Sequence, residues 1–325
     1  MPVRPAGARG RASAIDKDRR EAQDGAMAMA ASSIVSLSGP ERERIAADLA
    51  EIACAAGEIL LGHHGHDCPH VLKVDGSPSS HADLEAEQLI LASLLERFPA
   101  IPVVAEETCH DVQPADRFFL VDPLDGTRDF LAGSPEFAVC IALIEGNRPV
   151  AAALAAPGIG RVWQAGVVAH EASIEAGRPG PIRAVHTRPE PTGGLAALGS
   201  RRHGDIETEA CLDALGVTER RPAGSALKFA LIASGEADLY VRCGPTMEWD
   251  TAAGDHILTA AGGRVVTPTG RPIIYGRHAM AYRNGPFAAL GDPALAARVA
   301  LPDRGPILRP REGAGAPELT PVLRP

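Results

Sequence analysis

The stretch Val121-Asp122-Pro123-Leu124-Asp125-Gly126-Thr127 is the most informative part of this chain. It follows the apolar run 118–121, which predicts a buried strand. Pro123 cannot donate to a sheet ladder, so we expect the strand to end there. The two aspartates lie three residues apart across a bend, and Gly126 allows a close backbone approach. Carboxylates beside free amides suit a hard cation that holds a phosphate, although an Asx-type turn explains the same residues.

Two further acidic segments favour the cation over the simple turn. The apolar run 101–105 predicts another short strand and leads directly into Glu106 and Glu107. Far downstream, Asp250 lies at the start of a helix that we predict over 251–261. An aspartate at a helix N-terminus is also explained as a cap, so none of the three segments is decisive alone.

Together and in this order, the three segments resemble a known superfamily of phosphatases. The segments are Glu106-Glu107, Asp122-Pro-Leu-Asp-Gly-Thr127 and Trp249-Asp250-Thr-Ala-Ala-Gly254. They are similar to the motifs of the lithium-sensitive, magnesium-dependent phosphatases that include inositol monophosphatase and fructose-1,6-bisphosphatase. The resemblance covers roughly residues 40 to 300. It implies an α+β or α/β layered sandwich of the αβαβα type, with two subdomains and the site between them.

The resemblance also implies a role for individual residues. Glu106, Asp122 and the carbonyl of Leu124 would hold one Mg²⁺ ion, and Asp122, Asp125 and Asp250 a second, with Glu106 facing a weaker third site. Asp83 and Thr127 would orient and deprotonate the attacking water, and Glu107 is placed with them in the catalytic set. Asp83 ends the segment Ser80-His-Ala-Asp83, where the family often has threonine in place of Ser80. The full substrate-binding set would be Glu106, Leu124, Asp125, Gly126, Thr127, Ser225, Lys228 and Asp250.

The segment Gly224-Ser-Ala-Leu-Lys-Phe229 indicates the substrate. It resembles the Gly-Ser-Ser-Leu-Lys-Phe segment of the CysQ branch, the 3′(2′),5′-bisphosphate nucleotidases, and the run 200–203 resembles Ser-Arg-Ser-His of the same branch. The resemblance implies hydrolysis of adenosine 3′,5′-bisphosphate, or of its phosphosulfate PAPS, within sulfate assimilation. An inositol monophosphatase or sugar bisphosphatase on the same fold is the main alternative, because fold does not fix substrate. A non-catalytic nucleotide or metal sensor is a third.

Lysine usage supports the substrate assignment independently. The chain has 29 arginines but only three lysines, at 17, 73 and 228. Lys73 and Lys228 lie inside motifs, which suggests that a compact ammonium is needed at both places. We therefore expect Lys228 to contact the phosphate that is not cleaved. Chance retention of a few lysines is the competing explanation.

Composition and charge limit the other classes of function. The chain has 325 residues, an apolar content of 45% and a net charge of −9, which fits a globular protein and argues against general binding of nucleic acid. No apolar run approaches the ~20 residues that span a bilayer. Six cysteines without a C-x-x-C pair predict free thiols in a reducing compartment. We expect a cytoplasmic enzyme; peripheral attachment to the inner membrane and a homodimer are left open.

Domain boundaries follow from the distribution of proline, glycine and apolar residues. We predict a disordered extension over 1–38, an N-terminal α+β subdomain over 39–186 that carries most metal ligands, a C-terminal α/β subdomain over 187–302, and a disordered tail over 303–325. The first helix is predicted over 41–61, followed by a loop over 62–69. Its histidines, with His70 after them, could suggest a metal site, but a solvated loop is the better interpretation, since no helix or strand was expected to fix them.

Overall fold

The computed structural model describes residues 36–73, 76–200 and 205–304. The chain divides into two compact units, Met1–Ser36 and Leu37–Pro325, and every element described below belongs to the second. The predicted disorder of 1–38 and 303–325 falls almost entirely outside the described residues. No helix among the described residues combines the length and apolar character needed to span a bilayer.

The elements occur in two groups along the chain. The first group comprises α2 Gly39–His63, β1 His70–Leu72, β2 Pro78–Ser80, α3 His81–Arg97, β3 Val103–Ala105, β4 Arg117–Asp125, α4 Thr127–Leu131, β5 Ala138–Glu145, β6 Arg148–Ala156, η1 Pro157–Ile159, β7 Arg161–Ala165, β8 Ala169–Glu175, β9 Arg178–Pro179 and β10 Arg183–Ala184. The second comprises β11 Leu195–Gly199, α5 Ile206–Leu215, β12 Val217–Pro222, α6 Leu227–Ala233, β13 Leu239–Arg242, β14 Thr246–Met247, α7 Trp249–Ala260, β15 Arg264–Val266, η2 His278–Met280, β16 Arg283–Asn284, β17 Phe287–Leu290 and η3 Pro293–Ala297.

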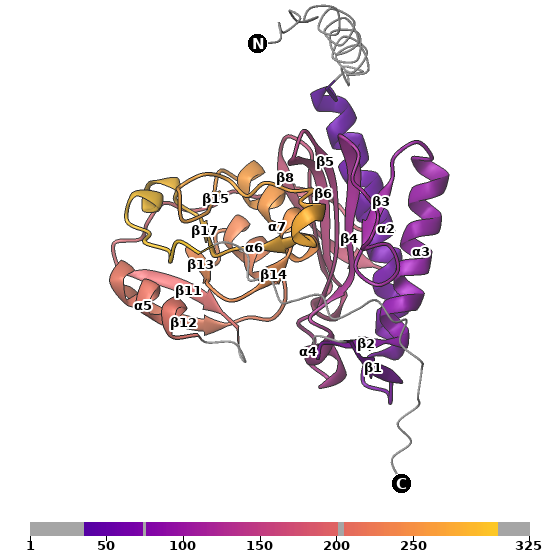
Figure 1. Ribbon diagram of the computed structural model, residues 1–325, viewed down its shortest axis with the longest axis horizontal. Coiled ribbons are helices and arrows are strands. Elements are labelled where there is room, and N and C mark those ends of the chain that lie inside the picture. The colour runs from indigo at the N-terminus through magenta and orange to yellow at the C-terminus, as the bar shows by residue number, and fades with distance from the viewer. Residues whose placement is uncertain (1–35, 74–75, 201–204, 305–325) are drawn as a thin grey trace, which may run out of the picture. The chain divides into compact units, whose positions relative to one another are not determined.

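Each group builds one main sheet (Figure 1). The larger sheet has the order β10-β8-β7-β6-β5-β4-β3, with β9 paired to β8. Its long strands are antiparallel neighbours, whereas β3 runs parallel to β4. The smaller sheet has the order β12-β11-β13-β17-β15, with parallel pairs around β11 and antiparallel pairs around β17. The parallel pairs require crossover connections, which α5 and α6 provide.

Alternating side chains of the sheets separate three apolar cores. Phe119 and Val121 of β4 pack with α2 and α3 on one face of the larger sheet. Phe118 and Leu120 point to the opposite face, where α6, α7 and one side of the smaller sheet complete a second core. The other side of the smaller sheet packs against α5. This order of layers, α–β–α–β–α, confirms the predicted fold class (Figure 1). The predicted subdomain boundary at residue 187 stays a prediction.

The end of β4 differs from the prediction. The strand continues past Pro123 to Asp125, and its register against β5 shifts between Asp122, opposite Cys140, and Asp125, opposite Ala138. Three steps along β4 therefore match two along β5, which is a β-bulge, and a bulge is one of the few places where a sheet accepts proline. The bulge replaces the free bend that we expected and keeps both aspartates on a fixed strand.

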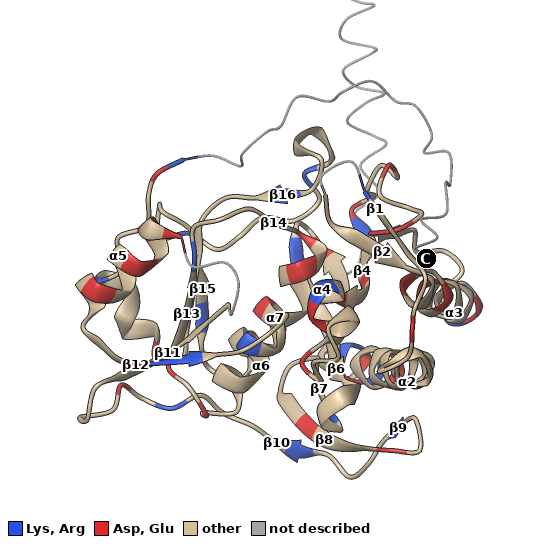
Figure 2. Cartoon of the chain, turned by 90° about the horizontal axis from the view of Figure 1, so that it is seen from below, with Lys and Arg blue, Asp and Glu red and all other residues tan. Residues whose placement is uncertain are grey.

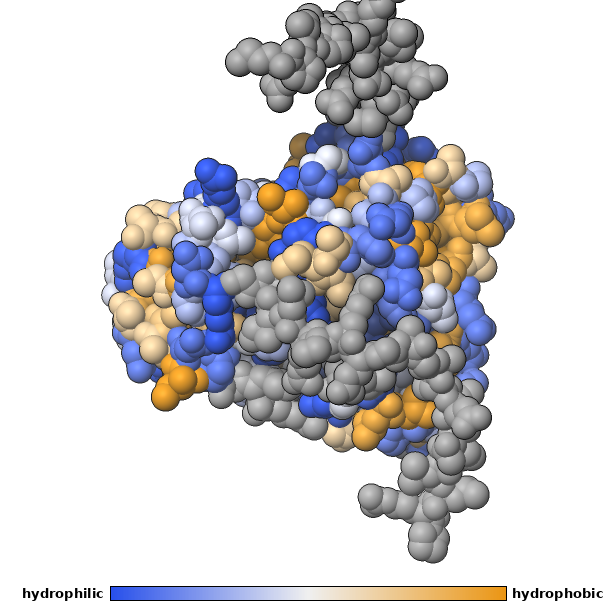
Figure 3. Space-filling view, viewed as in Figure 1, coloured by the Kyte–Doolittle hydropathy of each residue, from blue (hydrophilic) through white to orange (hydrophobic). Residues whose placement is uncertain are grey.

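On the surface shown in Figure 3, hydrophilic residues are interspersed with smaller hydrophobic areas.

The first helix extends to His63 rather than ending at Leu61, so that one of the histidines predicted in a loop belongs to a helix. The strands β8, β12 and β17 were not predicted. Their pairing partners lie in other elements, which a local pattern does not reveal.

Candidate active site

Three carboxylates that the sequence predicted as metal ligands meet in the structure. Glu106 follows β3, Asp122 lies in β4, and Asp250 lies in the first turn of α7. One oxygen of each lies within 4.8 Å of the other two. The elements β4, α4 and α7 that surround this point lie close together at the centre of Figure 2. We call these three residues the acidic cluster.

Asp122 of the acidic cluster is buried, Glu106 and Asp250 are partly buried, and Lys73 is the one ammonium paired with the cluster among the described residues. Burial, together with the neighbouring carboxylates, raises the pKa of Asp122 and of Asp250 well above the ordinary value. Burial also raises the pKa of Glu106 to about 7, although Lys73 opposes this effect. Among the described residues, Glu106 forms an ion pair with Lys73, and no ion pair reaches Asp122 or Asp250. Closely spaced carboxylates that are partly or fully removed from water need protons or a metal ion to reduce their repulsion, and an all-oxygen donor set fits Mg²⁺.

Asp125 is held by the loop before α6. Its Oδ2 atom accepts hydrogen bonds from the Ser225 hydroxyl at 2.8 Å and from the amide of Ala226. Ser225 adopts a positive φ of 57°, a conformation that is uncommon for residues other than glycine. A Cβ atom on Gly224 would lie 2.6 Å from the carbonyl oxygen of Glu136, so this position requires glycine. The loop therefore connects the two sheets at the acidic cluster.

The predicted pair Asp83 and Thr127 is in contact. The Thr127 hydroxyl lies 3.1 Å from Asp83 Oδ1 and 3.0 Å from the carbonyl oxygen of Leu124, and its single hydrogen serves one of them at a time. Asp83 Oδ2 accepts from the amide and hydroxyl of Ser80, the N-cap of α3, at 2.8 and 2.5 Å. Burial raises the pKa of Asp83 to about 6, against the effect of the Ser80 hydrogen bonds. Thr127 begins α4 directly after Gly126, whose φ of 93° favours glycine.

Glu107 is positioned by three residues that the prediction did not assign. Its carboxylate accepts from Lys73 Nζ at 2.7 Å and from the Ser79 hydroxyl at 2.8 Å. Buried Glu87 accepts hydrogen bonds from the amides of Glu107 and Thr108, at 2.8 and 2.9 Å, and so holds the turn that carries the glutamates. Glu87 lies four residues after Asp83 and therefore on the same face of α3, which is a signal that could have identified it.

The ammonium of Lys228 is held by contacts within the protein. It is buried and donates to the carbonyl oxygens of Ala223 at 3.1 Å and Ser225 at 2.6 Å, and it lies 4.9 Å from the ring centroid of Tyr240. Burial lowers its pKa to about 8. The two carbonyl groups belong to the loop that holds Asp125, and Tyr240 lies in β13. The expected contact with a phosphate stays a prediction.

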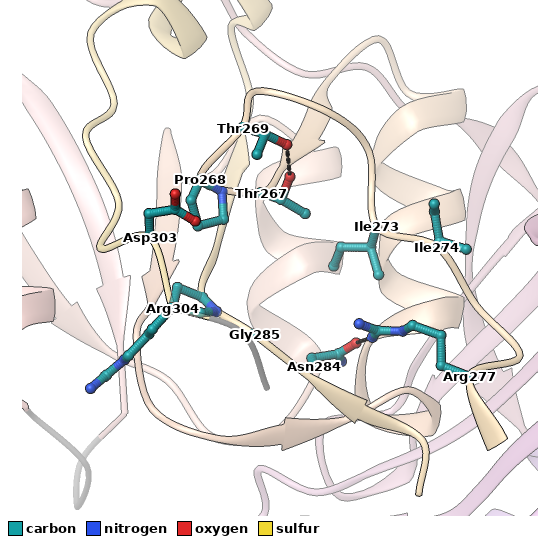
Figure 4. A pocket seen from close by; sticks show the side chains of 11 residues that line it. Thr267, Pro268, Thr269, Ile273, Ile274, Arg277, Asn284, Gly285, Asp303 and Arg304 are labelled. Atoms are coloured by element: carbon teal, nitrogen blue, oxygen red, sulfur yellow. Dashed lines mark hydrogen bonds between the residues drawn. The ribbon is translucent and has the colours of Figure 1, made fainter. Parts of the chain in front are cut away.

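Two cavities among the described residues lie away from the acidic cluster. One, of about 170 Å³, is lined by the loop 267–277 together with Asn284, Arg304 and their neighbours, and Figure 4 shows these side chains around it. The other, of about 270 Å³, lies beside β11 and β12. Neither is lined by a predicted site residue. We assign the active site from its carboxylates, because closely spaced acidic groups with raised pKa values are typical of functional sites. The presence of a cavity is not sufficient evidence for an active site.

Comparisons with known proteins agree with this assignment. The model of the inositol monophosphatase family matches residues 41–300. The 3′(2′),5′-bisphosphate nucleotidase CysQ of Escherichia coli K12 is 36% identical over 230 residues, which cover 69% of this chain and 91% of that protein. The structure of CysQ from Bacteroides thetaiotaomicron is 30% identical, with a TM-score of 0.65 over 76% of this chain and 97% of that one.

A solved inositol monophosphatase is similar to a lesser degree. The enzyme from Zymomonas mobilis is 26% identical, with a TM-score of 0.61 over 78% of this chain and 95% of that one. The family model covers most of the chain, and the motifs that carry the resemblance are those that form the acidic cluster and its surroundings. The chain belongs to the inositol monophosphatase family.

Proposed function

We propose that this chain is a magnesium-dependent 3′(2′),5′-bisphosphate nucleotidase that hydrolyses adenosine 3′,5′-bisphosphate to AMP and phosphate. The observation that carries the proposal is the acidic cluster of Glu106, Asp122 and Asp250 beside the pair Asp83 and Thr127. The names of the CysQ relatives support the choice of substrate. PAPS, which would yield APS, is a second substrate of the same chemical class.

We assign the metal ions to the carboxylates as the family resemblance implies. Glu106, Asp122 and the carbonyl of Leu124 would hold one Mg²⁺, and Asp122, Asp125 and Asp250 a second, with Glu106 also facing a third. Bound there, the ions would neutralise phosphate charge and lower the pKa of a water molecule. Asp122 is shared by both sites, and its Oδ1 atom accepts from the amide of Leu124 at 3.0 Å, which orients the carboxylate.

Asp83 and Thr127 would handle the proton of the attacking water. An ionised Asp83 accepts the Thr127 hydroxyl hydrogen, which leaves an oxygen lone pair of Thr127 free to accept a hydrogen bond from water. Because the pKa of Asp83 is raised to about 6, its carboxylate is a stronger base than an exposed aspartate and is still ionised at neutral pH. Glu107 supports this arrangement through Ser79, the neighbour of the α3 N-cap.

The remaining assigned residues would position the phosphate groups. The amides of Gly126 and Thr127 lie at the start of α4, where backbone N–H groups lack acceptors within the helix. Ser225 fixes Asp125, and we retain Lys228 as a contact for the phosphate that is not cleaved. All six cysteines, including Cys140 beside the cluster, are free thiols, which supports a reducing, cytoplasmic location.

Phosphate release from a panel of substrates tests the proposal. The panel contains adenosine 3′,5′-bisphosphate, PAPS, inositol monophosphate and fructose 1,6-bisphosphate, each with and without Mg²⁺. We expect the adenosine compounds to have the highest kcat/KM. A preference for inositol monophosphate would favour the alternative on the same fold, for which the Zymomonas structure is a precedent. If no compound in the panel releases phosphate, the proposed phosphatase activity is contradicted and a non-catalytic nucleotide or metal sensor is favoured.

A further inference from the structure

A second group of metal-binding side chains lies where the end of α2 meets the start of α3. His63 lies in the last turn of α2, and His81 and Glu85 lie one turn apart at the beginning of α3. One ring nitrogen of each histidine and one carboxylate oxygen all lie within 4.8 Å of one another. None of these three residues belongs to the site proposed above. We call them the histidine cluster.

A single oxygen of Glu85 faces both rings. Its Oε2 atom lies 2.8 Å from Nε2 of His63 and 3.8 Å from Nδ1 of His81. The two rings lie edge to face, with centroids 5.8 Å apart and an interplanar angle of 70°. Both histidines therefore present a nitrogen toward the same carboxylate, as the ligands of one ion would.

We propose that His63, His81 and Glu85 bind a divalent transition-metal ion of the zinc class. Two imidazoles and a carboxylate form a donor set that suits Zn²⁺, with bonds of about 2.0–2.2 Å. Ligand atoms on a tetrahedron of that size are about 3.3 Å apart. The measured separations of 2.8 and 3.8 Å fall on either side of this value, so small rotations of the side chains suffice. Mg²⁺ prefers oxygen ligands and does not fit this set.

Helical backbone fixes the ligands, and solvent reaches them. His81 and Glu85 are spaced i and i+4, which places their side chains next to each other on one helix face. The side chains of His63, His81 and Glu85 are 30%, 65% and 46% exposed, so an ion can enter and water can complete its coordination. Without a metal, an ion pair between His63 and Glu85 and an i,i+4 contact between His81 and Glu85 would account for the two distances separately. A bound ion accounts for both distances at once, because it requires both ring nitrogens to lie near one carboxylate oxygen.

Spectroscopy with Co²⁺ and calorimetry with Zn²⁺ test the site on the full chain without a histidine tag. An Asp122→Asn background and excess Mg²⁺ keep the acidic cluster from competing. We expect one ion per chain and the visible absorption of tetrahedral Co²⁺. His81→Ala should weaken Zn²⁺ binding at least tenfold, and the double variant His63→Ala/His81→Ala should abolish it. His66→Ala is the matched control, since His66 is an exposed neighbour outside the histidine cluster and should leave binding unchanged.

The folding of each variant is checked by thermal unfolding without metal, where the exposed histidines should contribute little. Zn²⁺ should raise the melting temperature of the parent and of His66→Ala, but not that of the double variant. No binding by the parent overturns the proposal. Equal binding by the parent and the double variant also overturns it, as does an equal loss in His66→Ala. Each of these outcomes is independent of phosphatase activity and so of the proposed function.

Discussion

Replacing Glu106 with glutamine tests whether the acidic cluster needs a cation. In the metal-free protein, burial raises the pKa of Glu106 from 4.5 to about 7. Between these values the folded chain holds a proton that the unfolded chain has lost. Stability therefore falls as the pH rises through this window, and the loss is complete above pH 7. A change from 4.5 to about 7 corresponds to about 3 kcal/mol.

Glutamine cannot ionise, so Glu106→Gln should lack this loss. We expect the free energy of unfolding of the variant, relative to wild type, to increase by about 3 kcal/mol between pH 5 and pH 8 in the presence of EDTA. In melting temperature this is roughly 6–12 °C for a domain of this size. Chemical denaturation at both pH values gives the free energies directly. Glu96→Gln, on the exposed face of α3, is the control and should show no such change.

Mg²⁺ should reverse the order of the two proteins at pH 8. A bound ion stabilises the folded wild type by mass action, and the variant lacks one of the ligands. The ion pair with Lys73 could oppose the effect of burial, because its ammonium lies 2.6 Å from Glu106 and favours the ionised carboxylate. If the difference in the free energy of unfolding between wild type and Glu106→Gln is the same at pH 5 and pH 8, the ion pair with Lys73 cancels the effect of burial on the pKa of Glu106. The charge of Glu106 is then balanced by Lys73 without a metal ion.

Four further predictions concern activity. Asp122→Asn should abolish turnover and weaken Mg²⁺ binding while the fold is retained, and near-normal turnover would rule out the site. With saturating Mg²⁺, kcat/KM should fall about tenfold per pH unit below about pH 6, because a protonated Asp83 cannot accept a proton. If kcat/KM stays constant down to pH 5, Asp83 is not the general base. Lithium should inhibit, and indifference at levels that inhibit a known relative would count against the mechanism. Lys228→Ala should lower kcat/KM on adenosine 3′,5′-bisphosphate by roughly ten- to a hundred-fold, mainly through KM, but not on inositol monophosphate; equal losses on both would refute phosphate recognition.

The acidic cluster could be predicted from the sequence because each carboxylate lies at the end of a local apolar pattern. The run 118–121 predicted β4, and the run 101–105 predicted the strand before Glu106. The apolar pattern did not predict the conformation at Pro123, where β4 continues through a bulge instead of ending. A bulge depends on the partner strand β5, and the residues that pair across two strands are not adjacent in the sequence.

Contacts between distant segments could not be predicted in the same way. Ser225 and Asp125 are 100 residues apart, and their hydrogen bond depends on the packing of α6 against the larger sheet. The histidine cluster was missed for a similar reason. The apolar spacing predicted a helix that ends at Leu61, yet α2 continues to His63. These two extra helical residues place His63 beside Glu85 of α3, so that a histidine expected in a loop lies on a helix.

The two lysines within the described residues connect composition to geometry. Lys73 Nζ lies 2.6 and 2.7 Å from oxygens of Glu106 and Glu107, and Lys228 Nζ lies 3.1 and 2.6 Å from two carbonyl oxygens. In both places a small tetrahedral ammonium reaches two acceptors of one turn, whereas the planar guanidinium of arginine needs a wider, flat partner. This explains why a chain so rich in arginine has lysine here. An ammonium has three N–H donors, and the carbonyls use two donors of Lys228, so a phosphate contact would depend on the third. The same side chain that holds the loop around Asp125 could thus bind the substrate, and only kinetics on two substrates separates the two roles.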